Sequence, residues 1–280
     1  ITIGVTEVPM SEASRFGIVT LDRSERVIGF QEKPKEPKSN LASMGIYVFN
    51  KSVLINCLEK NVQQKGAYDF GKDIIPATVG KYRIFGYRFN DYWRDVGTVD
   101  SYWQANMDLI VDLPELNLYG PDFDLRTVPR NLPPVKLGPR ASVCRSLVSD
   151  GCIINGRVEN SVLSPGVYIE EGAVVRDSII FDETTVDRDA VINRSIIDKQ
   201  VWVGDGAQIG FGDDMTPNQE EPHILNSGIT IIGKGAKVPK GIKIGRNCKV
   251  SCWVEEEDYA SDFIASGSSV AKKVPRRHQV

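Results

Sequence analysis

Two short stretches in the first third of the sequence combine residue types suited to a phosphorylated ligand. In residues 30–34 (FQEKP), Lys33 offers a compact positive charge to a phosphate, and Glu32 can accept hydrogen bonds from hydroxyl groups. In residues 92–98 (YWRDVGT), Asp95 is the best candidate metal ligand, because Mg²⁺ prefers carboxylate and phosphate oxygens. A lone Lys-Pro pair is otherwise an ordinary surface turn, so the functional interpretation depends on the neighbouring motifs.

Two small residues fit the same kind of site. Gly17 would let the backbone approach a ligand with no Cβ in the way, although a turn glycine explains it almost as well. Ser43 is a candidate hydroxyl partner for a sugar, and its alternative is a small residue that packs within a strand.

Length and composition describe an ordinary globular chain. Its 280 residues suffice for two hydrophobic cores, and 41% hydrophobic and 25% charged residues are typical values. A net charge of −3 gives no global positive field for nucleic acid or an anionic membrane, and no apolar run could cross a bilayer. The five cysteines lack zinc-site spacing, which favours reduced, buried thiols in a cytoplasmic protein.

Residues 1–111 mix the two kinds of secondary structure. We expect helices at 52–58, 70–79 and 98–111, the last with Thr98 as its N-cap. The expected strands are 1–8, 17–21, 26–30, 42–49 and 83–89, the second and third forming a hairpin. This alternation predicts an α/β, partly Rossmann-like domain.

The remaining sequence divides into a linker and a repeat. Six prolines within residues 112–143 exclude a helix or a central strand, which predicts an extended linker. From residue 144 to 280, apolar residues return at steps of five or six, which predicts a parallel β-helix with a tail. Residues 211–227 interrupt this period with a polar loop. The repeated positions are Ile169, Val175, Phe181, Val186, Ile192, Ile197, Val203, Ile209, Ile232, Val238, Ile244 and Val250.

The order of the motifs resembles that of the bacterial ADP-glucose pyrophosphorylases (glucose-1-phosphate adenylyltransferases), and the resemblance covers nearly the whole chain. Its supports are residues 13–17 (ASRFG), 32–34 (EKP), 41–49 (LASMGIYVF), 69–76 (DFGKDIIP) and 93–98 (WRDVGT).

The resemblance implies attack by the phosphate of glucose 1-phosphate on the α-phosphorus of ATP, with Mg²⁺, to give ADP-glucose and pyrophosphate. It also implies that the β-helix is left-handed, that the protein is a homotetramer and that Asp69, Phe70 and Trp93 complete the glucose pocket. Trp93 as a plain core residue is the alternative. Lys199 and Lys234 stand where the family carries lysines that bind a phosphorylated allosteric effector, and two solvated surface lysines are the alternative.

Three other functions are open. A β-helix acyltransferase would use a catalytic histidine, but the two histidines, His223 and His278, avoid regular coil positions. A non-catalytic regulatory or assembly subunit is a stronger rival, because no glycine-rich phosphate loop precedes the motifs. We therefore expect the N-terminal nucleotide-binding part to be missing and the chain alone to be inactive. A sister enzyme that uses UTP, dTTP or GTP is the third.

Overall fold

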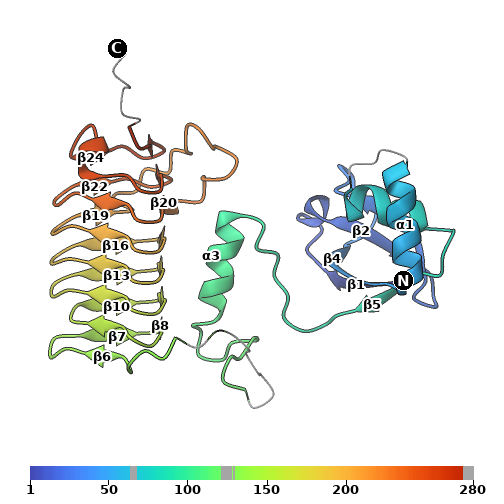
Figure 1. Ribbon diagram of the computed structural model, residues 1–280, viewed down its shortest axis with the longest axis horizontal. Coiled ribbons are helices and arrows are strands. Elements are labelled where there is room, and N and C mark those ends of the chain that lie inside the picture. The colour runs from blue at the N-terminus through green and yellow to red at the C-terminus, as the bar shows by residue number, and fades with distance from the viewer. Residues whose placement is uncertain (64–67, 121–127, 129, 274–280) are drawn as a thin grey trace, which may run out of the picture. The chain divides into compact units, whose positions relative to one another are not determined.

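The computed structural model describes residues 1–63, 68–120, 128 and 130–273. The chain forms two compact units, Ile1–Trp93 and Arg94–Val280. Figure 1 shows the strands and helices of each unit. The division falls earlier than the predicted domain end at residue 111, because the intervening helix packs on the β-helix.

The first unit contains a mixed five-stranded sheet in the order β3-β2-β4-β1-β5, counted over the described residues. Strand β1 pairs antiparallel with the central β4 and parallel with the edge strand β5, and β2 and β3 form the predicted hairpin. Asp22 closes that hairpin, since its carboxylate accepts hydrogen bonds from the backbone N–H groups of Ser24 (2.8 Å) and Arg26 (3.0 Å). The strands are β1 (Thr2–Glu7), β2 (Gly17–Leu21), β3 (Val27–Glu32), β4 (Leu41–Val48) and β5 (Phe85–Arg88).

Helical segments join these strands, which confirms the α/β class. Ile75 of α2 is fully buried with the sheet residues Ile3 and Val5 in one apolar cluster. The predicted helix at 52–58 is longer, because α1 extends to Gln63. The segments are η1 (Ala13–Arg15), α1 (Lys51–Gln63), the π-helical turn η2 (Phe70–Ile74) and α2 (Ile75–Thr78).

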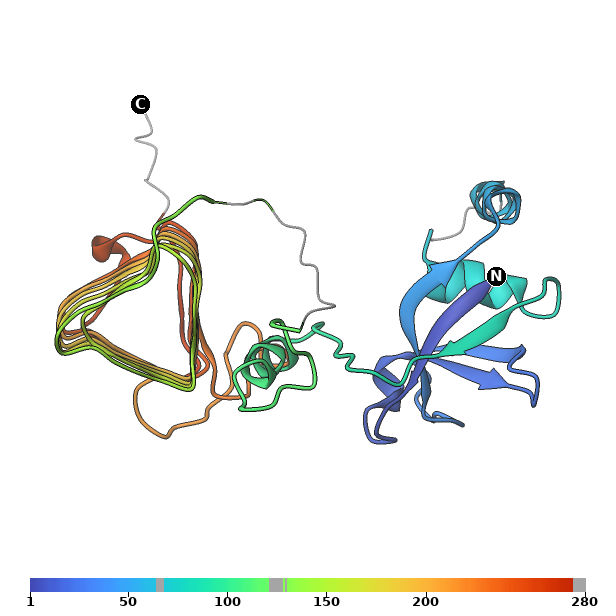
Figure 2. The ribbon, with the colours of Figure 1, turned by 90° about the horizontal axis from the view of Figure 1, so that it is seen from below.

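The second unit is a parallel β-helix, as the repeat predicts. Seen along its axis, the coil is a triangular prism whose three sides are the three parallel sheets (Figure 2). One side holds β6 (Lys136–Leu137), β9 (Ile153–Ile154), β12 (Tyr168–Ile169), β15 (Thr185–Val186), β18 (Trp202–Val203) and β21 (Lys237–Val238). The second side holds β7 (Ser142–Cys144), β10 (Arg157–Glu159), β13 (Val174–Arg176), β16 (Val191–Asn193), β19 (Gln208–Ile209), β22 (Lys243–Ile244) and β24 (Phe263–Ile264). The third side, called the docking side below, holds β8 (Leu147–Val148), β11 (Val162–Leu163), β14 (Ile179–Ile180), β17 (Ser195–Ile197), β20 (Thr230–Ile232), β23 (Lys249–Val250) and β25 (Ser269–Val270).

Eleven of the twelve predicted repeat positions point inward and are buried. The exception is Phe181, which lies half-exposed outside the coil, and Ile180 occupies the inward position instead. Pairing of Ile180 with Ile197 in the next coil fixes this register. The two residues are similarly apolar, so hydrophobicity alone does not separate them.

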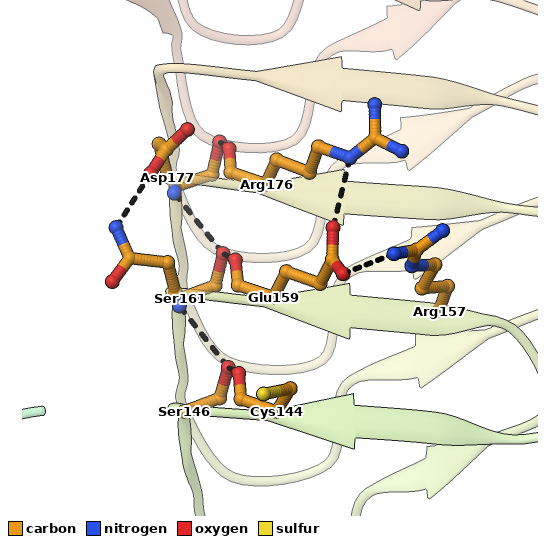
Figure 3. A network of polar contacts seen from close by, with 9 residues as sticks. Cys144, Ser146, Arg157, Glu159, Ser161, Arg176 and Asp177 are labelled. Carbon is orange, nitrogen blue, oxygen red and sulfur yellow. Dashed lines mark hydrogen bonds and ion pairs between the residues drawn. The ribbon is translucent and has the colours of Figure 1, made fainter.

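A ladder of serine hydroxyls crosses one corner of the coils (Figure 3). Ser161 Oγ donates to the carbonyl of Glu159 (2.7 Å) and accepts from the backbone N–H of Ser178 (3.1 Å) in the next coil. Ser178 repeats the arrangement toward the N–H of Ser195 (3.1 Å). The hydroxyls satisfy backbone groups that the tight corner would otherwise leave buried without a partner.

The coils begin at Lys136, ahead of the predicted start at residue 144. The prolines at 133, 134 and 139 flank the two-residue strand β6 and therefore do not interrupt it. Residues 121–127 and 129 of the predicted linker lie outside the described residues. A short 3₁₀ turn, η3 (Glu256–Asp258), follows β23 near the C-terminal end.

The polar insertion runs between β19 and β20, and residues 210–229 are called the corner loop below. Its Asn218 is fully buried and accepts hydrogen bonds from the backbone N–H groups of Glu220 (3.0 Å) and Glu221 (2.9 Å). The Asn218 amide also donates to the carbonyl of Asn247 (3.1 Å), so the corner loop is anchored to the coils.

Helix α3 (Val99–Asp108) packs against the docking side of the β-helix. Its Trp103 and Met107 are buried against Ile179 and Ile196, which face outward from β14 and β17. Thr98 caps the helix as predicted, because its hydroxyl accepts from the backbone N–H of Ser101 (3.1 Å).

Two predictions from composition concern membrane-spanning helices and the state of the cysteines. Of the helices that the structure describes, not one is long and apolar enough to traverse a bilayer. All five cysteines are free thiols, and Cys57, Cys152 and Cys248 are buried as expected. Cys144 and Cys252 are exposed instead.

Substitution Ser178→Ala should destabilise the β-helix by about 1–3 kcal/mol, because the buried N–H of Ser195 would lose its acceptor. Urea unfolding followed by circular dichroism measures the change. Ser142→Ala removes an exposed hydroxyl from β7, in an earlier coil, and serves as the control, with an expected change close to zero. Equal midpoints for both variants would contradict a stabilising role for the ladder.

Candidate functional site

The ends of β2 and β3 bring three predicted residues together in the first unit. Gly17 is buried, and a Cβ added there would lie 2.9 Å from Glu32 Oε2 and 2.6 Å from Phe30 Cζ. The space above Gly17 is therefore occupied by the Glu32 carboxylate and the Phe30 ring. Gly17 is a strand residue needed for close packing, and the turn explanation does not apply.

A second glycine holds the same carboxylate from the other side. Gly71 of η2 is buried, and a Cβ there would lie 2.5 Å from Glu32 Oε2 and 3.4 Å from Asp69 Oδ1. Asp69 caps η2 by accepting a hydrogen bond from the backbone N–H of Lys72 (2.9 Å). The two glycines thus set the position of the Glu32 side chain, with Asp69 nearby.

Lys33 follows in an uncommon backbone conformation. Its φ is +45°, in the left-handed region that side chains other than glycine rarely adopt. The N–H of Lys33 donates to the carbonyl of Phe16 (3.0 Å), which ties it to the start of β2. Such strain typically costs about 1–3 kcal/mol and is concentrated at functional sites. The side chain is exposed, so its ammonium group is accessible.

Hydroxyl and aromatic side chains meet where β4 lies against η2. Ser43 of β4 is buried, and its Oγ donates to the hydroxyl of Tyr47 (3.4 Å). The Tyr47 ring stacks on Phe70, with centroids 5.8 Å apart. Burial raises the pKa of the Tyr47 phenol, and the negative charges of Glu32 and Asp69 add to the rise. The phenol therefore stays protonated and can donate a hydrogen bond at neutral pH.

Trp93 lies at the end of the first unit and meets Phe16 edge to face, with ring centroids 5.8 Å apart. Both rings pack against the buried cluster that includes Val8 and Ile18. Trp93 therefore has a core contact, and it remains half-buried, which leaves part of its side chain available to a ligand.

Asp95 belongs to the second unit, so a cleft shared with Lys33 stays a prediction. Its carboxylate is half-buried, and a Cβ at Gly97 would lie 3.0 Å from Asp95 Oδ2. The described residues contain no group of three or more His, Cys, Asp or Glu side chains arranged for a metal. One carboxylate suits Mg²⁺ when substrate phosphates and water supply the other ligands.

Lys199 and Lys234 occupy the same corner of successive coils. The backbone N–H of Gly235 donates to the Lys199 carbonyl (2.9 Å), and that of Trp253 donates to the Lys234 carbonyl (2.8 Å). Both lysines are exposed. The Lys234 Nζ lies 5.8 Å from the centre of the Trp253 ring, within cation–π range. The structure therefore places the two predicted lysines side by side, with an aromatic face beside them.

Sequence reasoning missed three residues of these two sites. Gly71 belongs to the motif at residues 69–76, and Tyr47 belongs to the motif at residues 41–49. Neither motif indicates that Gly71 contacts Glu32 or that Tyr47 stacks on Phe70. Trp253 joins Lys234 only through the coil-to-coil register. In each case the missing information was a contact between segments distant in sequence.

Comparisons with known proteins agree with the motif order. Residues 1–111 match the family described as nucleotidyl transferase, and residues 133–232 match the GlmU-like C-terminal hexapeptide family. A glucose-1-phosphate adenylyltransferase of Acetivibrio thermocellus is 44% identical over 97% of this chain. The proteins of that name from Thermomicrobium roseum and Pseudothermotoga lettingae are 46% and 40% identical over 96% and 97% of the chain. The chain spans 64–65% of the length of these three relatives.

Substitution Gly71→Ala should weaken binding of the hexose phosphate expected from the motifs by about tenfold, because the new Cβ displaces the Glu32 carboxylate. The obstructing atom is the flexible end of a side chain, so the thermal midpoint should change little. Titration calorimetry measures the affinity. Gly29→Ala lies on β3, the strand that carries Glu32, where the new Cβ would meet Thr20, and is the matched control. Full affinity in Gly71→Ala would refute the placement of Glu32.

Proposed function

The chain is a homologue of the glucose-1-phosphate adenylyltransferases over 97% of its length, and from that premise we propose that its protein makes ADP-glucose and pyrophosphate from ATP and glucose 1-phosphate. The supporting observation is the enclosure of Glu32 by Gly17 and Gly71, directly beside the strained Lys33. An anion site next to a hydroxyl-binding carboxylate matches the two halves of a sugar phosphate.

The first unit would hold the sugar phosphate. The Lys33 ammonium pairs with the phosphate and lowers the repulsion between two anionic substrates. The Glu32 carboxylate accepts hydrogen bonds from sugar hydroxyls, and the hydroxyls of Ser43 and Tyr47 provide further polar partners. Phe70 and Trp93 supply apolar ring faces. These groups orient the phosphate oxygen for in-line attack on the α-phosphorus.

The reaction balances without a covalent enzyme intermediate. A phosphate oxygen of glucose 1-phosphate forms a bond to the α-phosphorus of ATP, and the bond from that phosphorus to the bridging oxygen of pyrophosphate breaks. The protein contributes positioning and charge neutralisation. Asp95 would hold Mg²⁺ together with phosphate oxygens. The ion, when bound, offsets negative charge on the reacting phosphate and the leaving group.

The choice of nucleotide and the assembly are parts of the same proposal. All three relatives named above are adenylyltransferases, which favours ATP over UTP, dTTP or GTP. We assign residues 1–111 to the catalytic part of the enzyme. We also propose that the protein is a homotetramer and that it is cytoplasmic. A non-catalytic regulatory subunit remains the alternative, and the turnover assay below decides between them.

Substitution Lys33→Ala should raise the KM for glucose 1-phosphate by about 10- to 100-fold, since a charge-assisted contact is lost. Asp95→Asn should lower kcat by about 100-fold or more, the scale for losing one group that stabilises charge in the transition state. Pyrophosphate release by the full-length protein gives both constants. Lys38→Ala, an exposed lysine in the same loop, is the control. Equal losses of kcat in the first two variants would contradict the division of roles, and absence of turnover in the wild type would favour the regulatory subunit.

Lys199 and Lys234 would together bind the phosphate of an allosteric effector. Lys199→Ala and Lys234→Ala should each weaken binding of inorganic phosphate by about two- to fivefold, because both lysines are exposed and their charges are screened. Titration calorimetry measures this affinity. Lys240→Ala, also exposed on the β-helix, should leave it unchanged. Equal binding by all variants would favour the alternative of two solvated lysines.

A further inference from the structure

The segment that carries Asp95 is tied to both ends of helix α3. Arg94 Nε lies 2.7 Å from Asp108 Oδ2, in the last turn of the helix. At the other end, Thr98 caps the helix through reciprocal hydrogen bonds with Ser101. Asp95 directly follows Arg94 and lies three residues before Thr98. The position of its backbone therefore follows the position of α3.

Helix α3 is in turn fixed on the β-helix. Trp103 Nε1 donates a short hydrogen bond to the carbonyl of Asp177 (2.7 Å), a corner residue of the coils. The apolar face of the helix is buried against outward-facing side chains of the docking side, among them Ile179, Ile196 and Phe181. Tyr102 stacks on Phe181, with ring centroids 6.5 Å apart.

Arg194 joins this helix to a third part of the unit. Its guanidinium carbon lies 4.4 Å from the centre of the Trp103 ring, and its Nη2 lies 3.6 Å from Asp100 Oδ1 in the first turn of α3. Its Nε donates to the carbonyl of Ser227 in the corner loop (3.1 Å). One side chain thus contacts the helix twice and the corner loop once.

The surroundings of Arg194 favour a fixed side chain. The residue occupies a coil corner with φ +44°, in the column of corner residues that precede the ladder serines. Its side chain is 31% exposed, so its contacts are partly shielded from water and salt. A planar guanidinium can stack on an indole and donate hydrogen bonds at its edge at the same time, which an ammonium cannot do.

We infer that Arg194 is a positioning residue for Asp95, acting through helix α3, and that it links the corner loop of the β-helix to the metal-binding segment. This rests on the proposed function for the role of Asp95. Displacement of the corner loop would remove the acceptor at Ser227 and loosen the hold of Arg194 on Trp103 and Asp100. The β-helix, rather than the sheet of the first unit, then fixes the candidate metal ligand.

Hydrogen exchange of the 280-residue chain tests the physical link without any activity measurement. Arg194→Met should increase exchange in residues 94–108 by about fivefold or more, the lower end of typical coupling between linked sites. Arg246→Met is a matched control, because Arg246 Nε donates to the carbonyl of Gly212 in the same corner loop (2.6 Å). Unchanged exchange in Arg194→Met, or an equal increase in Arg246→Met, would overturn the inference.

Kinetics of the full-length protein test the consequence. Arg194→Met should raise the Mg²⁺ concentration for half-maximal rate by about fivefold and lower kcat, with the KM for glucose 1-phosphate changed less than about twofold. Arg194→Lys should recover only part of this loss. A purely structural role would lower the thermal midpoint and leave the Mg²⁺ dependence unchanged, and that result would overturn the inference.

A second variant separates this inference from the proposed function. Asp100→Asn removes the ion pair without altering the coil corner, and it should shift exchange in residues 94–108 and the Mg²⁺ dependence in the same direction as Arg194→Met. Full kcat in Asp95→Asn would refute the metal role of Asp95. Unchanged hydrogen exchange in both Arg194→Met and Asp100→Asn would refute the positioning role of Arg194 and would leave the proposed role of Asp95 untouched.

Discussion

Hydrogen bonding between successive coils is the constraint on which the second unit depends. Each two- or three-residue strand inside a side pairs with the strands above and below it, and the backbone must turn sharply between the three sides. At one corner, the hydroxyls of Ser161 and Ser178 satisfy the groups that the turn leaves over. Because the coils that carry β14 and β17 keep the same corner, the outward residues Ile179 and Ile196 lie in register and form one apolar surface. Helix α3 binds that surface, and the segment with Asp95 depends on the helix.

Under the proposed function, the first unit solves a different problem, since it must hold the Glu32 carboxylate in place for the hydroxyl groups of a sugar. Close packing achieves this. The Glu32 carboxylate fills the space above Gly17 and Gly71, and the left-handed backbone of Lys33 directs the chain onward. In the proposed function, the groups for the sugar phosphate lie in the unit built on a sheet, whereas the candidate metal ligand Asp95 lies in the unit that contains the β-helix.

Local sequence patterns predicted much of the fold, because the spacing of apolar residues and the residue types of turns are set by neighbours along the chain. The steps of five and six identified the β-helix, and the polar turn at Asp22 identified the hairpin. Phe181 was misplaced since its neighbour Ile180 is equally apolar, and only pairing with Ile197 distinguishes them. Candidate residues within one motif, such as Glu32 and Lys33, could be proposed from the sequence. The contacts of Gly71 with Glu32 and of Trp253 with Lys234 were not, because they join segments whose proximity is set by tertiary packing. The partner of α3 was hidden for the same reason.

The corner loop also bears on how such a chain can change over evolutionary time. The loop leaves the coil after β19, and the chain rejoins the coil at β20. Ser195 still pairs with Thr230, and Gln208 still pairs with Lys243, so the insertion does not change the register of the coils. Lengthening a corner therefore costs the neighbouring coils no pairing, whereas a single residue gained or lost within a strand would turn inward side chains outward. Related chains can therefore diversify at the corners while inheriting an unaltered scaffold.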